Sequence, residues 1–304
     1  NGSGSTVLDG SAADTVLTVR PGAGVRLRGV TVKNGASAGD GGGVRVEGGT
    51  LIADDVVLED NDALTRGGAI SVDASGEARL SDCQLRNNTA DRGAGGFTND
   101  RGYLELDGCT VDGNVAASWG GGLEVYDDAE LVVIDSTISD NEAADYGGGI
   151  ECNEGGIISV SDASISDNLA LGADGGGIDL YGCDLTITDA LVDGNASASG
   201  GGGIYIDLES SVIADRIELG GNTASSGGAI SVAGGLEILD SDIYANSAAS
   251  RGGGVYVDHS GADINFSAVD FSGNAPGDVY SADIAAASGW GLGATFTCDA
   301  SGCY

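Results

Sequence analysis

Three acidic residues at matching places in a repeated sequence are the strongest candidates for chemistry. Glu124, Glu151 and Asp179 each follow a run of glycines and one apolar residue. In a structure that turns once per repeat, they would stack into an outward patch of carboxylates. Oxygen ligands suit Ca²⁺ better than soft metals, and paired carboxylates in a groove can cleave glycosidic bonds. The patch is therefore a candidate cation site, with a solvated acidic face as the alternative.

Other residues argue against catalysis at this patch. A lyase-type site would place an Arg or Lys beside the acids, and between residues 102 and 304 only Arg216 and Arg251 are present. The single histidine, His259, gives little support to Ser/His/Asp catalysis or to a His-rich zinc site. The repeats are nearly equal in length, whereas active sites are commonly built from longer loops. We therefore expect no catalytic residues, no enzymatic activity and no cofactor, apart from Ca²⁺ at the acidic positions.

The repeats that position these residues begin with small residues and an apolar anchor, and the anchors are 25 to 28 residues apart. Each repeat holds three short apolar runs between Gly, Asp or Asn, as at 44–46, 51–52 and 56–58. Such runs are typical of strands, and no segment has the apolar spacing of a helix. With strands stacked about 4.8 Å apart, the pattern predicts an all-β fold, a single parallel β-helix of about ten rungs with three short strands per rung. Residues 1–280 form this β-helix, and 281–304 form a C-terminal cap or docking segment.

An asparagine near the end of each repeat predicts an internal ladder. Equivalent residues of successive rungs lie one above the other, so each side-chain amide can bond to the turn backbone and to the next asparagine. The expected ladder consists of Asn61, Asn88, Asn114, Asn141, Asn168, Asn195, Asn222, Asn246 and Asn274. A column of aspartates that begins at Asp54 is expected to cap turns. Arg28, one rung earlier, would neutralise Asp54.

The net charge of −35, with 12 Lys and Arg against 47 Asp and Glu, excludes nucleic acid as a partner because phosphate binds basic surfaces. The chain has no apolar run of transmembrane length, so we expect no direct membrane insertion in this segment.

Six cysteines, an even number without a CxxC spacing, predict disulfides and an oxidising compartment. The expected pairs are Cys83 with Cys109, Cys152 with Cys183, and Cys298 with Cys303. Cys83 and Cys109 each lie five residues before a ladder asparagine, so they should stack on adjacent rungs. Cys152 and Cys183 also lie on adjacent rungs, although their registers differ. Cys298 and Cys303 would close a four-residue terminal turn. We therefore expect an extracellular or cell-surface location.

Several motifs resemble a known group of surface proteins. GGAI at 67–70 and 227–230, the GGGI, GGGL and GGGV variants, and FSGN at 271–274 resemble the GGA(I/L/V) and FxxN repeats of chlamydial polymorphic outer membrane proteins. More broadly, residues 1 to about 280 are similar to right-handed parallel β-helix proteins of the pectin-lyase-like group. The resemblance implies a right-handed β-helix. It also implies relatives that include adhesins and passenger domains as well as polysaccharide lyases and hydrolases.

The sequence thus favours an extracellular structural or adhesive β-helix, and the alternative is a polysaccharide-binding or polysaccharide-cleaving β-helix enzyme. A cell-surface glycan or a host surface is the expected external partner. We also expect end-to-end self-association into a fibre, because open strand edges need a cover. Trp290, Leu292 and Phe296 are the candidate docking residues. A walled groove with a carboxylate pair beside a base would favour the enzyme, and a smooth rod would favour the structural role.

Overall fold

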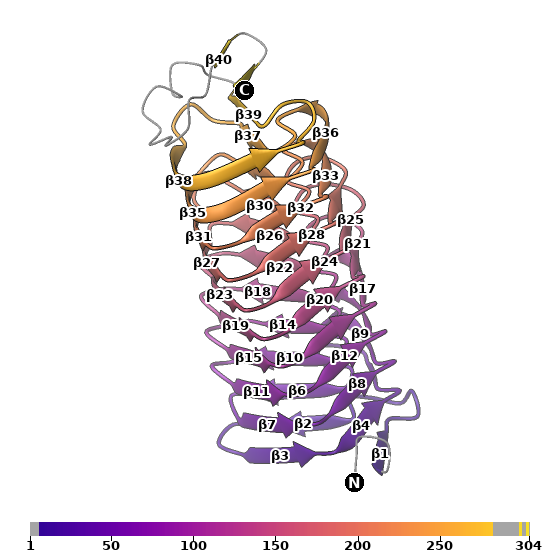
Figure 1. Cartoon of the computed structure of the whole chain (residues 1–304). Coiled ribbons are helices and arrows are strands. Elements are labelled where there is room, and N and C mark those ends of the chain that lie inside the picture. The colour runs from indigo at the N-terminus through magenta and orange to yellow at the C-terminus, as the bar shows by residue number, and fades with distance from the viewer. Residues whose placement is uncertain (1–5, 282–297, 300–301, 304) are drawn as a thin grey trace.

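The chain winds into an elongated solenoid whose successive turns stack along one axis (Figure 1). The computed structural model describes residues 6–281, 298–299 and 302–303. All regular elements within these residues are strands, and none of them forms a helix long and apolar enough to cross a membrane. The prediction of an all-β parallel β-helix of about ten rungs is confirmed.

Sheet A carries the longest strands of each rung, and a bend divides most of them into two. The strands before the bend are β3 (Gly24–Arg28), β7 (Thr50–Asp54), β11 (Glu77–Ser81), β15 (Tyr103–Asp107), β19 (Glu130–Ile134), β23 (Ile157–Ser161), β27 (Asp184–Thr188) and β31 (Ser211–Asp215). Those after it are β1 (Thr6–Asp9), β4 (Val30–Lys33), β8 (Val57–Glu59), β12 (Gln84–Arg86), β16 (Thr110–Asp112), β20 (Thr137–Ser139), β24 (Ser164–Ser166), β28 (Leu191–Asp193) and β32 (Glu218–Gly220). In β35 (Gly235–Tyr244) and β38 (Asp263–Ser272) the two halves are continuous.

Sheets B and C complete each turn. Sheet B contains β2 (Leu17–Val19), β6 (Val44–Glu47), β10 (Ile70–Asp73), β14 (Gly96–Thr98), β18 (Leu123–Tyr126), β22 (Ile150–Asn153), β26 (Ile178–Tyr181), β30 (Ile204–Ile206), β34 (Ile230–Val232), β37 (Val255–Val257), β39 (Val279–Ser281), β41 (Gly302–Cys303) and β40 (Cys298–Asp299). Sheet C contains β5 (Ala36–Ser37), β9 (Asp62–Arg66), β13 (Thr89–Arg92), β17 (Val115–Trp119), β21 (Glu142–Ala143), β25 (Leu169–Ala170), β29 (Ala196–Ser197), β33 (Thr223–Ser226) and β36 (Ser247–Arg251).

The three apolar runs of each repeat do not correspond one to one with the three sheets. Two of them, such as 51–52 and 56–58, belong to the two halves of sheet A, and the first belongs to sheet B. The third sheet is built from short strands around small residues such as Ala63 and Ala90, which pair in register. A run of apolar residues could not reveal these strands, because their inward positions are alanines.

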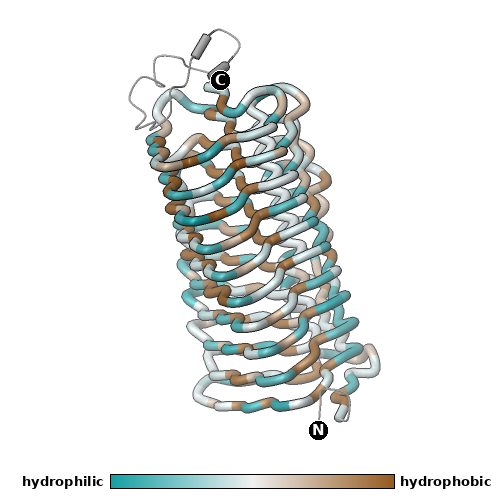
Figure 2. Tube along the Cα trace, in the orientation of Figure 1, coloured by the Kyte–Doolittle hydropathy of each residue, from teal (hydrophilic) through white to brown (hydrophobic). Residues whose placement is uncertain are grey.

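The core runs unbroken along the axis. Anchor residues stack in register, as Ile150 does between Leu123 and Ile178, and all three are buried. Figure 2 shows hydrophobic positions recurring at the same places in successive turns. Because each apolar side chain lies on the equivalent one of the next rung, the burial that stabilises one rung depends on its neighbours.

The asparagine ladder is present as predicted. At each step the backbone N and the side-chain Nδ2 of one asparagine donate to Oδ1 of the next; from Asn141 to Asn168 these distances are 3.1 and 3.0 Å. Nδ2 also donates to a backbone carbonyl of the preceding rung, as Asn168 does to Ile138 at 2.9 Å. The ladder runs from Asn61 to Asn274, and the side chains are buried except at its last member. It satisfies polar groups at a bend where water has no access.

The aspartates near the sheet A bend occupy two columns instead of one, which corrects the alignment drawn from the sequence. Asp82, Asp135 and Asp162 have positive φ values of 53, 47 and 51°, in a turn position that glycine fills in other rungs. Asp54 lies one position earlier and pairs with Ser81 in register. Aspartate tolerates the left-handed conformation better than most residues. The expected contact of Asp54 with Arg28 is confirmed, with Nε to Oδ2 at 3.1 Å.

One of the predicted disulfides is present and one is not. Cys152 and Cys183 are bonded, with their Cα atoms 6.2 Å apart. Cys83 and Cys109 stack as expected but are buried free thiols, and Cys109 Sγ accepts a hydrogen bond from Cys83 N at 3.4 Å. Their pairing was predicted wrongly. Side chains in register on parallel strands lie about 4.8 Å apart, whereas a disulfide needs Cβ atoms about 3.8 Å apart.

At the C-terminal end, β40 and β41 pair antiparallel and place Cys298 opposite Cys303. Val279 of β39 pairs with Cys303, so this short hairpin continues sheet B. The third disulfide depends on side chains outside the described residues. The candidate docking residues Trp290, Leu292 and Phe296 also lie outside them.

Candidate functional site: a pocket over the middle of sheet B

The residue after each anchor points away from the core and forms one column along sheet B. In rung order the column is Arg45, Ser71, Phe97, Glu124, Glu151, Asp179, Tyr205, Ser231, Tyr256 and Tyr280. The three candidate acids are therefore direct neighbours in register, as the spacing predicted. Aromatic residues follow them toward the C-terminal end of the rod.

These acids are not a solvated face, which corrects the alternative considered from the sequence. Glu124 is only 1% exposed, and Glu151 and Asp179 are 3% exposed. A second column of residues, just before the strands of sheet B, lies beside the acids. It includes Trp119 and Tyr146, which form a parallel bridge. Trp119 and Tyr146 line the same pocket as Glu151 and Asp179.

The glycines that precede the anchors let the carboxylates sit so deep. Gly147 has a φ of +62°, and a Cβ there would lie 2.6 Å from Oε2 of Glu151. Gly175 has a φ of +64°, and a Cβ would lie 2.4 Å from Cβ of Asp179. Both the turn and the space therefore require glycine at these positions. The repeated glycine run, which could be mistaken for a phosphate-binding loop, instead makes room for acidic side chains.

Glu124 is neutralised from the rung before it. Nε of Arg92 donates to Oε1 of Glu124 at 2.8 Å, and the Arg92 guanidinium lies 4.3 Å from the ring of Trp119 and 4.9 Å from that of Tyr126. Even so, burial raises the pKa of Glu124 to about 7, because desolvation outweighs the attraction of Arg92. Oε2 of Glu124 has no hydrogen-bond partner.

Glu151 and Asp179 form a buried acidic pair without a cation of their own. Oε1 of Glu151 accepts from Asn153 Nδ2 at 2.6 Å, while Oε2 has no hydrogen-bond donor. Burial raises the pKa of each carboxyl well above its ordinary value, and nearby carboxylates, including Asp179 for Glu151 and Asp174 for Asp179, raise it further. Each carboxyl therefore keeps its proton to a higher pH than an exposed carboxyl would.

The pair opens into a pocket of about 320 Å³. Trp119 and Tyr146 line one side, with ring centroids 6.3 Å apart and planes at 80°. Tyr181 and Tyr205 line it as well, and Asn153 and Asp174 add polar groups. A concave site with apolar walls and a few polar groups is the usual form of a small-ligand pocket.

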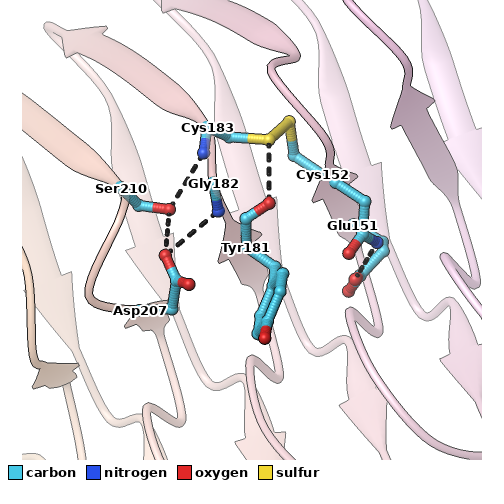
Figure 3. Close-up of a disulfide and its surroundings, with 8 residues drawn as sticks. Glu151, Cys152, Tyr181, Gly182, Cys183, Asp207 and Ser210 are labelled. Atoms are coloured by element: carbon cyan, nitrogen blue, oxygen red, sulfur yellow. Dashed lines mark hydrogen bonds between the residues drawn. A yellow bond between two sulfur atoms is a disulfide. The ribbon is translucent and has the colours of Figure 1, made fainter.

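The disulfide joins β22 to the turn after β26, beside the pocket. Cys152 directly follows Glu151, and Cys183 comes two residues after Tyr181 (Figure 3). Oδ1 of Asp207 accepts from Gly182 N at 3.0 Å and from Ser210 Oγ at 2.6 Å. Figure 3 shows the Asp207 contacts beside Tyr181 and the disulfide next to them. The two residues that follow this wall residue, Gly182 and Cys183, are thus both held in place.

Sequence reasoning found the acids but missed Arg92, Trp119, Tyr146 and Tyr181. Arg92 lies 32 residues before Glu124, and a register shift in β13 between Ala90 and Arg92 separates it from the simple period. The expectation that no basic residue stands beside the acids rested on the chain after residue 102, and Arg92 precedes it. Tyr205 continues the column of the acids, whereas Trp119, Tyr146 and Tyr181 lie in neighbouring columns, at positions that vary among repeats.

The arrangement gives no particular support to a metal centre. Within the residues that the structure describes, no three His, Cys, Asp or Glu side chains gather closely enough to hold a metal ion. Calcium binding at Glu124, Glu151 and Asp179 therefore stays a prediction.

Comparison with known proteins agrees with the fold. No curated protein and no solved structure matches the chain. A family model described as the right-handed beta helix region matches residues 15–184, which is more than half of the sequence. The match includes Glu124, Glu151 and Asp179. The chain therefore belongs to the right-handed β-helix region family.

Proposed function

We propose that this protein is an extracytoplasmic adhesive β-helix that binds a glycan in the pocket over sheet B. The observation that carries the proposal is the pocket itself, in which four aromatic side chains surround a pair of buried carboxyl groups. Aromatic faces pack against the C–H faces of sugar rings, and carboxyl and amide groups bond to hydroxyls. Its volume, about 320 Å³, lies at the lower end of the usual range for ligand pockets.

The disulfide supports the proposed location. Cys152 and Cys183 are bonded, and such bonds persist mainly in secreted or surface proteins. The position of the site also fits an adhesive role, because its lining residues, Trp119 to Tyr205, belong to the middle rungs and not to the first or last rungs of the solenoid.

The test is a glycan array followed by calorimetry on the wild type and single alanine variants. We expect Trp119→Ala and Tyr181→Ala each to weaken glycan binding about tenfold or more, since a buried aromatic contact commonly contributes at least 1 to 2 kcal/mol. Tyr244→Ala is the matched control, because Tyr244 lies at the end of β35 in sheet A, outside the pocket. Glycan binding that is equally strong in all variants would refute the assignment to this pocket.

A second candidate is glycan cleavage, which the acidic pair favours. A carboxyl group with a raised pKa can act as general acid, and Asp174 on the pocket wall could serve as the second carboxylate. Release of reducing ends from a bound glycan, lost in both Glu151→Gln and Asp179→Asn, would establish it. Binding without release leaves the adhesive function.

A further inference from the structure

The unusual feature of the pocket is that its buried acids face no cation from the protein. Burial and the neighbouring Asp179 and Glu124 raise the pKa of Glu151 more than Arg92 lowers it, and Arg92 is itself bonded to Glu124. Burial and two further acids, Asp174 and Asp207, raise the pKa of Asp179, while the side chain of Glu151 lowers it. Burying charges without a partner is costly, so such groups either keep a proton or take up a positively charged ligand.

The preceding rung shows how this protein accommodates a cation at the same place. There the guanidinium of Arg92 bonds to Glu124 and lies against the rings of Trp119 and Tyr126. In register, Glu151 follows Glu124 and Tyr146 follows Trp119. The next rungs thus repeat a carboxylate beside an aromatic ring. In these rungs the position equivalent to Arg92 is occupied by Trp119 and then by Tyr146.

The rings favour an organic cation over a metal ion. A cation over an aromatic face is attracted by its π electrons, and rings around a cationic group are the known means of binding ammonium ligands. Trp119, Tyr146, Tyr181 and Tyr205 all line the pocket, and Oε2 of Glu151 is buried there without a hydrogen-bond donor. A metal ion would need several converging oxygen ligands, and no such group occurs among the described residues.

We propose that the pocket binds an organic ammonium group beside Glu151 and Asp179 and between the aromatic rings, and that its ligand is an amino sugar with a free amine. The amino sugar rests on the proposed glycan function; the ammonium site rests on the geometry alone. The ammonium would donate hydrogen bonds to the buried carboxylates, and the sugar ring would pack against the aromatic walls.

The groups around Glu151 predict how the site responds to pH. Those that shift its pKa are Asp179, Glu124, Asn153 and Arg92, and those that shift the pKa of the adjoining Asp179 are Asp174, Asp207 and Glu151 itself. Tyr146 and Tyr205 also face the acids, and burial together with the negative charges of the acids raises the pKa of both phenols. Because burial and neighbouring carboxylates raise both carboxyl pKa values, a bound cation competes with the protons of the pair. Tetramethylammonium, whose charge does not change with pH, should therefore bind more tightly as pH rises.

The experiment is calorimetric titration of the whole chain with three probes: the trisaccharide of glucosamine, the trisaccharide of N-acetylglucosamine and tetramethylammonium. We expect the glucosamine trisaccharide to bind at least about tenfold more tightly than its acetylated form. Glu151→Gln should weaken glucosamine binding by about 30-fold or more, since loss of one partner from a buried charge pair is costly. Glu130→Gln, on the exposed start of β19, is the matched control and should change nothing. Circular dichroism checks that both variants are folded.

The outcomes separate this inference from the proposed function. Equal binding of the two trisaccharides, unaffected by Glu151→Gln, overturns the ammonium site and leaves the glycan function standing. If tetramethylammonium binds in a way that depends on Glu151 and neither sugar binds, the ammonium site is supported. The same result overturns the amino sugar as the ligand, and the pocket then no longer supports the glycan function. Binding of none of the three probes overturns the inference as a whole.

Discussion

Glu124 shows how burial and pairing compete at a single residue. Its carboxylate has a guanidinium partner in Arg92, yet its side chain is fully shielded from water and one oxygen has no donor. The attraction of Arg92 lowers the pKa and desolvation raises it, and the second effect is larger. A carboxyl group of this kind stabilises the folded state only while it holds its proton.

The stability of the protein should therefore fall as pH rises through a defined window. The pKa of Glu124 is about 7 in the folded state and 4.5 without the fold. Between these values the folded state binds more protons than the unfolded state, so the free energy of unfolding decreases with rising pH, by about 3 kcal/mol in total for this group. Urea unfolding across this window should show a shallower decrease for Glu124→Gln than for the wild type. The exposed control Glu130→Gln should keep the wild-type slope, and identical slopes for all three proteins would contradict the assignment.

At the scale of secondary structure, the asparagine ladder ties the rungs together inside the solenoid. Asn168 donates to Ile138 O and to Asn195 Oδ1, and its own Oδ1 accepts from the backbone and side chain of Asn141. Asn274 stands at the end of the ladder and is only partly buried. One residue type thus has different neighbours in the middle of the rod and at its end.

Replacement of a ladder asparagine should accordingly cost more in the middle than at the end. Asn168→Ala leaves several buried donors and acceptors without partners, each of which costs about 1 to 3 kcal/mol, so we expect a loss of about 3 kcal/mol or more. Asn274→Ala should cost clearly less, because water can reach that site. Urea unfolding with backbone hydrogen exchange would measure both effects. Equal losses at the two positions would mean that the ladder does not act as a buried network.

The same columns explain which parts of the molecule were predictable. Glycine, anchor and asparagine positions recur at nearly constant spacing, so the rungs, the ladder and the stacking of Glu124 and Glu151 followed from the sequence. Burial of the acids did not, because it depends on neighbouring columns, and Trp119 and Tyr146 of one such column line the same pocket. Arg92 escaped notice because the register of sheet C shifts just before it. Differences of one residue between repeats therefore hid the features that make the site.

At the scale of the whole molecule, charge is distributed unevenly along the rod. Residues 1–101 hold 10 Lys and Arg against 14 Asp and Glu, a net charge of −4, while residues 102–304 hold 2 against 33, a net charge of −31. Many of the arginines near the N-terminal end are in ion pairs, such as Arg28 with Asp54 and Arg45 with Glu47. The charge difference therefore lies mainly in the surplus of acids on later rungs. Contact between the N-terminal end of one rod and the C-terminal end of another brings together less like charge than contact between two C-terminal ends.

The ends of the stack also have strand edges that can pair. Among the described residues, β3 pairs only with β7, and β38 pairs only with β35, while β41 covers the edge of β39 in sheet B. We propose that rods join head to tail through such edges, and a contact of this kind that does not close on itself produces a filament. Light scattering and electron microscopy at high protein concentration should show linear oligomers. Trp290→Asp, in the candidate docking segment, should shorten them, whereas Tyr244→Ala on sheet A should not. Monomers alone across a range of salt and calcium concentrations would rule out end-to-end assembly, and side-by-side aggregates would show that the contact lies on a face of the rod.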